Sequence, residues 1–163
     1  MLVSGKKGGR IFLFLACFWF WAGGAVFLSA QTPDIDNSPF LSALGLNPAE
    51  VIDSFGSPEE ILPFRGGNDR EDMVVFYYPK HFYVFFFENR VWQIRFDHRY
   101  KEEVCSCTLG MTKREILSRL GYPFSVVKDS FIYHYSDQGY PVKARLFFRN
   151  GRLDDVYVFR GDY

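Results

Sequence analysis

The sequence predicts an α+β fold: a tandem repeat of a helix followed by an antiparallel meander of three to four strands, with the helices on one face of the sheet. Residues 44–58 and 109–123 carry the same motif at a constant offset of 65 residues. Segments rich in β-branched and aromatic residues follow each copy. The breaks between these segments are too short for crossover connections, so neighbouring strands should pair antiparallel. We therefore divide the chain beyond residue 30 into repeat 1, residues 31–103, and repeat 2, residues 104–163.

The first 30 residues have the order of a secretory signal peptide. Three cations within the first ten residues precede an unbroken apolar run over residues 11–21, and small residues follow up to Ala30. Cleavage after Ala30 would release a periplasmic or secreted protein. The apolar stretch 11–30 is also long enough to cross a bilayer, so the alternative is an uncleaved N-terminal membrane anchor.

Charge and composition exclude some classes of partner. Residues 1–30 contain three Lys or Arg and no carboxylate, so the remaining chain has 16 Lys and Arg against 19 Asp and Glu, a net charge near −3. No basic field is present to hold phosphate backbones, and nucleic acid is not an expected partner. Aromatic residues make up 20% of the chain, which is enough for a substantial core and argues against disorder.

Each repeat should open with a short helix that begins at a capping box. Asn47 can cap the first helix, Pro48 takes its first position, and Glu50 falls three residues after the cap. Thr112 and Glu115 have the same spacing in repeat 2. In such a box the two side chains accept hydrogen bonds from backbone groups that the helix itself cannot pair.

Both helices should end at a glycine. Gly56 and Gly121 follow the last apolar turn, and glycine accepts the left-handed backbone conformation at little cost. Pro58 and Pro123 then prevent the helix from continuing. Within each helix the apolar residues are spaced for one buried stripe: Val51, Ile52 and Phe55 in repeat 1, and Ile116, Leu117 and Leu120 in repeat 2.

Three aromatic or β-branched segments follow each helix, and a further short strand precedes them. Asn150-Gly151 is a strong hairpin-turn signal, and the polar stretch 65–72 predicts a loop. If two such units lie side by side in one sheet, that sheet would have six to eight strands; the sequence alone leaves this open. The expected strands are 61–64, 73–78, 81–87 and 91–98 in repeat 1, and 125–128, 131–135, 142–148 and 153–159 in repeat 2.

Alternation along the strands assigns their residues to two faces of the sheet. Toward the helices we expect Trp92, Ile94, Phe96, Val142, Ala144, Leu146, Val156 and Val158. Toward the other side, which we call the open face, we expect Gln93, Arg95, Lys143, Arg145, Asp155 and Tyr157.

The run Phe82–Phe87 contains five aromatic residues and one valine. A central strand buried on both sides would have such a composition, and this is the favoured interpretation. If the far face of the sheet is open, alternate aromatic residues would instead be exposed there, as in surfaces that bind a protein, a glycan or a membrane.

Cys105 and Cys107 are the two cysteines beyond the signal segment. One hypothesis is a redox-active pair or half of a metal site, since a bridge across one residue would be strained and labile. No histidine lies near them at zinc-ligand spacing. The favoured interpretation is a pair of packing or disulfide-linked cysteines at the junction between the repeats.

Other patterns give no support for catalysis. His81, His98 and His134 are spread over three predicted strands and are interpreted as structural or surface groups. Alternation should point the carboxylates of Asp154 and Asp155 to opposite faces, so they cannot act as a close acid pair. The sequence has no Gly-x-Ser-x-Gly elbow and no phosphate-binding glycine loop. We therefore predict no enzyme activity, no cofactor and no metal site.

The motif Leu-Gly-Met-Thr-Lys-Arg-Glu-Ile-Leu-Ser-Arg-Leu-Gly-Tyr-Pro at 109–123, followed by aromatic strands, resembles the small outer-membrane-assembly lipoprotein (SmpA/OmlA, BamE-like) family. It is also similar to the tandem-repeat β-lactamase inhibitor proteins. The resemblance covers most of residues 44–159, once per repeat. It implies an exported, non-enzymatic domain that works by protein contact, and in the inhibitors the open sheet face and its loops engage the partner.

These observations favour an exported non-enzymatic protein-interaction or scaffolding domain of the cell envelope. We expect a protein partner on the open face, with membrane association possible through the N-terminal segment. The alternative is a carrier of a small apolar ligand or lipid, with a pocket between helices and sheet. A third hypothesis is a thiol redox protein that uses Cys105 and Cys107. The expected binding residues are Arg95, Tyr157, Gln93, Asp155, Lys143 and Arg145.

Overall fold

A computed structural model describes residues 39–65, 73–135 and 139–163. The predicted signal segment and most of the predicted loop 65–72 lie outside the described residues. In the described part the helices are α1 (Pro39–Ala43), α2 (Pro48–Phe55) and α3 (Lys113–Leu120). The strands are β1 (Glu60–Phe64), β2 (Met73–Tyr78), β3 (Phe82–Phe87), β4 (Arg90–Phe96), β5 (Ser125–Val127), β6 (Ser130–Tyr135), β7 (Val142–Arg149) and β8 (Arg152–Arg160).

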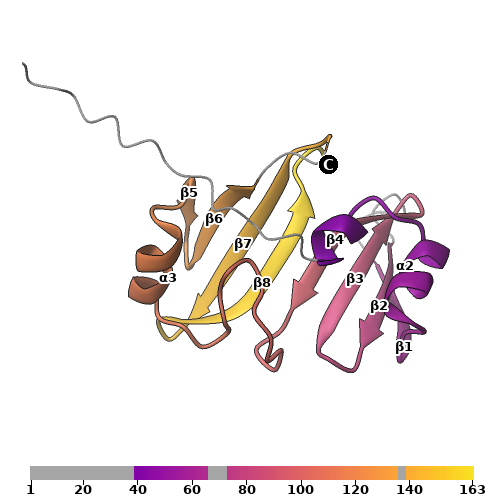
Figure 1. Cartoon of the computed structure of the whole chain (residues 1–163), viewed down its shortest axis with the longest axis horizontal. Helices are drawn as coiled ribbons and strands as arrows, with labels where there is room; N and C mark the ends of the chain where they lie inside the picture. The colour runs from indigo at the N-terminus through magenta and orange to yellow at the C-terminus, as the bar shows by residue number, and fades with distance from the viewer. Residues whose placement is uncertain (1–38, 66–72, 136–138) are drawn as a thin grey trace, which may run out of the picture.

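All eight described strands form one antiparallel sheet in the order β1-β2-β3-β4-β8-β7-β6-β5 (Figure 1). The meander β1–β4 and the meander β5–β8 therefore meet at β4 and β8, which leaves β1 and β5 at the edges. The pairing of β4 with β8 runs from Gln93 opposite Phe159 to Phe96 opposite Val156. The α+β class and the antiparallel pairing agree with the prediction, and the structure places both meanders in one sheet, a point that the sequence left open.

Both predicted capping boxes are present. Glu50 Oε2 accepts from the Asn47 amide at 2.7 Å, and Glu115 Oε2 accepts from the Thr112 amide at the same distance. The helices end where the sequence predicts, and the terminal glycine Gly56 has a φ of 81°. The local sequence thus determines where α2 and α3 begin and end.

The helices α2 and α3 are each fixed to the sheet by two side-chain hydrogen bonds of the same kind. An arginine at the start of the last strand donates to the carbonyl of the glycine before the helix. A tyrosine of the second strand donates to the carbonyl of the glycine that ends the helix. The pairs are Arg90–Gly45 (3.3 Å) and Tyr78–Gly56 (3.1 Å) in the first half, and Arg152–Gly110 (2.9 Å) and Tyr133–Gly121 (3.0 Å) in the second.

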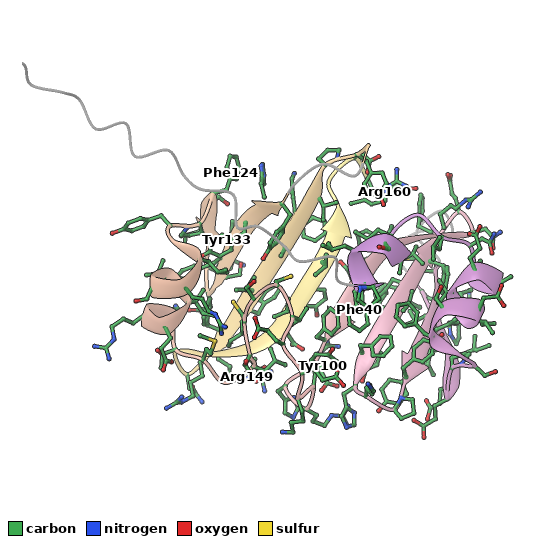
Figure 2. All side chains as sticks on the ribbon, in the orientation of Figure 1. Phe40, Tyr100, Phe124, Tyr133, Arg149 and Arg160 are labelled. Atoms are coloured by element: carbon green, nitrogen blue, oxygen red, sulfur yellow. The ribbon has the colours of Figure 1, made fainter. Side chains whose placement is uncertain are left out.

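The hydrophobic core lies between one face of the sheet and a layer made of α1, α2, α3 and the segment 97–112. Figure 1 shows α2 and α3 near opposite ends of the sheet and α1 near its middle. The helix α1 was not predicted from the sequence. Its Phe40 packs edge-on against Phe96 at 4.8 Å between ring centroids and lies 6.3 Å from Tyr100, which Figure 2 labels beside it. This short helix covers the part of the sheet between α2 and α3.

Two β-bulges change the predicted assignment of faces. In β4, Phe85 and Phe86 of the neighbouring strand pair with Gln93 and Val91, so Trp92 is an extra residue. Val91 is buried in the core, whereas Trp92 is half-buried and its indole N–H lies 3.2 Å from Met73 Sδ. The prediction that Trp92 faces the helices is wrong because strict alternation stops at the bulge.

The equivalent bulge in β8 inserts Asp154 between residues that pair with β7. Leu153 and Val156 are both buried in the core, so Asp154 and Asp155 both project from the other face. The prediction that their carboxylates point to opposite faces is therefore wrong. The negative charge of Asp154 is close enough to contribute to a raised pKa of Asp155.

The aromatic run Phe82–Phe87 forms β3 and alternates in burial. Phe82, Val84 and Phe86 are buried in the core. Tyr83, Phe85 and Phe87 are half-buried on the opposite face. The favoured interpretation, a strand buried on both sides, is wrong because one of its faces is only half-buried. The alternative holds in that the open face carries alternate aromatic side chains.

Removal of either helix cap should destabilise the protein. We expect Asn47→Ala and Thr112→Ala each to lower the free energy of unfolding by about 1 kcal/mol, and the double variant by about 2 kcal/mol because the caps are far apart in the fold. Urea unfolding followed by circular dichroism measures both. Thr108→Ala is the control, since Thr108 is exposed and caps no helix. Unchanged stability in both capping variants would contradict this role of the boxes.

Candidate functional site

The candidate site is the open face of the sheet, opposite the described helices. Two rows of side chains cross it, each with one residue from each of several neighbouring strands. The central row is Tyr77, Tyr83, Arg95, Tyr157 and Arg145, which are cross-strand partners from β2 to β7. The second row is Val75, Phe85, Gln93, Phe159, Lys143 and His134.

At the middle of the central row, Arg95 forms a bidentate ion pair with Asp155. Its Nε and Nη2 donate to Asp155 Oδ1 at 3.1 and 2.9 Å, and Nη2 also donates to Oδ2 at 3.1 Å. The guanidinium carbon lies 5.4 Å from the ring centre of Tyr83 and 5.6 Å from that of Tyr157. The pair joins β4 to β8, and the planar guanidinium is held between two tyrosine rings.

Burial is the largest influence on the protonation of this pair. It raises the pKa of Asp155 and outweighs the opposite effect of Arg95. Burial also acts to lower the pKa of Arg95, but there the hydrogen bonds and charge of Asp155 prevail and the pKa is raised. The bidentate geometry favours the ionised form of both partners. Arg95 is therefore a fixed, internally neutralised group.

A second ion pair, between Asp97 and Arg99, lies beside Tyr83 of the central row. Asp97 is almost fully buried and accepts hydrogen bonds from Arg99 Nη2 at 2.6 Å and from the Arg99 amide at 2.8 Å. The Tyr83 hydroxyl donates to the same carboxylate at 3.2 Å. Burial acts to raise the pKa of Asp97, but the Arg99 and Tyr83 hydrogen bonds prevail and lower it to about 2. This network fixes the orientation of the Tyr83 ring.

Arg145, at the other end of the central row, is in a different environment. Its guanidinium carbon lies 5.7 Å from the ring centre of Phe147 and 6.0 Å from that of Phe159. Among the described residues it has no carboxylate partner, and its buried Nε has no hydrogen-bond acceptor. Lys143, two residues earlier on the same face, also forms no ion pair within the described part of the chain.

All six binding residues predicted from the sequence lie on this face. Arg95, Tyr157 and Arg145 belong to the central row, Gln93 and Lys143 to the second row, and Asp155 bridges to Arg95. The sequence did not reveal that Arg95 and Asp155 neutralise each other. It also did not single out Tyr77, Phe147 and Phe159, although the alternation within each strand was a signal that could have found them. Tyr83 belongs to the aromatic run for which exposure on the open face was the alternative interpretation.

The two cysteines lie in a tight turn on the helix-covered side. The backbone groups of Val104 and Cys107 pair at 2.8 and 2.9 Å around the turn. Cys105 and Cys107 are both buried and both free thiols. Burial, the largest cause, raises the pKa of each thiol to about 12. A buried thiol with so high a pKa is a poor nucleophile, which argues against the redox hypothesis.

The three histidines do not meet. His81 Nδ1 lies 2.9 Å from the Tyr77 hydroxyl, His134 stacks on Phe124 at 3.9 Å, and His98 is exposed in a turn. Within residues 39–65, 73–135 and 139–163, no group of three or more His, Cys, Asp or Glu side chains could hold a metal ion.

Two of the surface hollows formed by the described residues are lined in part by charged side chains. One of about 420 Å³ lies beside α3 and is lined in part by Arg114, Glu115 and Arg119. The other, of about 260 Å³, is lined in part by Lys80 and Lys101. Between the helices and the sheet the space is occupied by buried core side chains.

None of the described helices is long and apolar enough to cross a membrane. The sequence matches no family model and no curated protein.

Two solved structures have a similar fold. A cysteine-rich secretory protein from Staphylococcus aureus Mu50 has a TM-score of 0.54 and 16% identity, over 74% of this chain and 46% of the other. An extracellular protein from Bacillus anthracis Ames that contains an SCP domain has a TM-score of 0.51 and 12% identity, over 99% of this chain and 51% of the other. This chain thus spans about half the length of these proteins, and at such identities the similarity concerns the fold alone.

A third structure, a suspected β-lactamase inhibitor protein from Streptococcus mutans, is less similar. Its TM-score is 0.31 and its identity 14%, over 78% of this chain and 98% of the other. A score this low carries no conclusion about function. The outer-membrane-assembly lipoproteins do not occur among these three structures.

Asp97 should make stability depend on pH in the acid range. The folded pKa of about 2 is lower than the value of about 3.9 for an exposed Asp. The ionised carboxylate therefore stabilises the fold above about pH 4, and this stabilisation is lost as the pH falls toward 2. We expect Asp97→Asn to cost about 1–2 kcal/mol at pH 7, a figure reduced because Arg99 is partly exposed, and to cost little at pH 2.

Urea unfolding at several pH values tests this expectation. Asp129→Asn is the matched control, since Asp129 forms a surface pair in which its side chain is 81% exposed. A pH-independent difference between the Asp97 variant and the parent would contradict the assignment.

Proposed function

We propose that this protein is an exported, non-enzymatic interaction or scaffolding domain of the cell envelope that binds a protein partner through the open face of its sheet. The observation that carries the proposal is the central row. It presents tyrosine and arginine side chains, half-buried and in cross-strand register, over five neighbouring strands.

The composition of this row suits protein recognition. Tyrosine and arginine are enriched among the residues that contribute most to binding at protein interfaces. The ion pairs of Arg95 with Asp155 and of Asp97 with Arg99 hold these side chains before a partner arrives. A preformed surface loses less side-chain entropy on association, which favours affinity.

The size of the face also supports a protein partner. The two rows cross six strands, β2 to β6 through the centre of the sheet. At about 4.8 Å between neighbouring strands, six strands span about 24 Å. A typical stable interface covers about 800 Å² on each partner, which is a patch about 28 Å on a side.

We further infer that the wide face results from duplication of a helix-and-meander unit. The capping boxes, the arginine and tyrosine contacts to glycine carbonyls, and the β-bulges occur at equivalent positions in both halves. A single unit would supply four strands. Two units joined at β4 and β8 supply the continuous surface.

Export is part of the proposal. The first 30 residues have the order of a signal peptide. The two structures of similar fold are described as a secretory protein and an extracellular protein.

Photocross-linking in the native cell envelope tests the proposal. A photoreactive phenylalanine analogue is placed at Phe147 on the open face and, as control, at Ile52 on α2. These side chains are 36% and 38% exposed. We expect one or more defined protein adducts from position 147 and none of these from position 52.

The same adducts should fall at least tenfold in the Tyr157→Ala variant, because the central row loses the tyrosine ring between Arg95 and Arg145. Tyr122→Ala is the control, since Tyr122 is 83% exposed in the loop before β5. Equal adducts from positions 147 and 52, or adducts that Tyr157→Ala leaves unchanged, would remove the open face from the proposed function.

A further inference from the structure

We propose that Arg145 is the docking point for an acidic side chain of the protein partner, with Lys143 as the second cation of the same subsite. This inference rests on the proposed function and specifies the chemistry of the partner.

The first observation is the contrast between the two arginines of the central row. Arg95 is neutralised by Asp155 through three hydrogen bonds. Arg145, on β7, lies next to Tyr157 on the side away from Arg95 and has no ion pair among the described residues. Its positive charge is therefore uncompensated on a half-buried surface.

The second observation is the way the Arg145 side chain is held. The rings of Phe147 and Phe159 lie within 6.0 Å of the guanidinium carbon, and Nε is buried without an acceptor. A buried donor without an acceptor is unfavourable, and this distinguishes Arg145 from Arg95, whose Nε donates to Asp155. With Nε buried, the guanidinium can meet a partner only through its two terminal Nη groups. These form a fork that matches the two oxygens of a carboxylate.

The third observation is the local charge. The chain beyond residue 30 has a net charge near −3, yet the two cations Arg145 and Lys143 on β7 form no ion pair with any described residue. Charge complementarity across interfaces directs association and selects partners. The partner segment that covers β7 should therefore be acidic at the corresponding position.

The arrangement favours a protein over other anionic partners. Nucleic-acid sites use many contacts between basic residues and phosphates, and membrane-surface sites use clusters of four to eight cations. Here two cations are flanked by aromatic rings on a sheet face, which suits single carboxylates within an otherwise apolar and aromatic contact.

Selection from a random 12-residue peptide library on the immobilised full chain tests the inference. We expect the selected peptides to be enriched in Asp and Glu and to bind Arg145→Gln at least tenfold more weakly than the parent. Arg149→Gln is the matched control and should leave binding unchanged. Arg149 lies at the end of β7 (Figure 2), its side chain is 73% exposed, and it is paired with Asp154. Arg145→Lys, which keeps the charge, should recover part of the affinity and tests the inference even if the Gln variant folds poorly.

Other outcomes would overturn the inference. One such outcome is a set of peptides that bind the Tyr157→Ala variant more weakly than the parent but show no enrichment in acidic residues and bind the Arg145→Gln variant normally. That outcome would contradict the Arg145 subsite and leave the proposed function intact. Peptides that all bind Tyr157→Ala normally would count against the open face as a whole. Arg145-dependent binding to phosphatidylglycerol vesicles, with no acidic peptides selected, would assign the site to a membrane surface.

Discussion

The antiparallel pairing of β4 with β8 is the constraint on which the rest of the molecule depends. Each half alone would be a four-stranded meander covered by two helices, α1 and α2, or by one, α3, and each would expose the edge of its last strand. Pairing these two edges satisfies their backbone groups and removes both edges at once. It also aligns the side chains of the two halves, because Arg95 lies opposite Tyr157 and Ile94 opposite Val158.

Two surfaces follow from this pairing. On the helix side, Ile94, Phe96, Val156 and Val158 are almost fully buried and join the cores of the two halves. On the open side, the ion pair of Arg95 with Asp155 crosses the same junction and lies between two tyrosine rings. The rigid core and the proposed binding face are thus opposite sides of one strand pair. A partner that binds the central row would contact both halves of the chain.

The sequence determined the regular features of the fold and missed those that depend on pairing. The caps at Asn47 and Thr112 and the turn at Asn150 are local, so residue type alone predicts them. The bulges were missed because strict alternation was assumed, although Val91 and Ile94 are three residues apart and both apolar, a spacing that indicates an extra residue. The six residues expected to bind a partner were placed on the correct face, but which arginine is neutralised depends on how β4 and β8 align, and no local pattern contains that information.

Amide hydrogen exchange measured by NMR on the full chain is the most direct test of the single sheet. If β4 and β8 pair as described, the hydrogen-bonded amides among residues 93–96 and 156–159 should exchange only with global unfolding, like those at the centre of each meander. Cross-strand contacts between Arg95 and Tyr157 should appear in the same spectra. Rapid exchange along both strands while β3 and β7 stay protected would show two separately folded halves and would contradict the continuous open face.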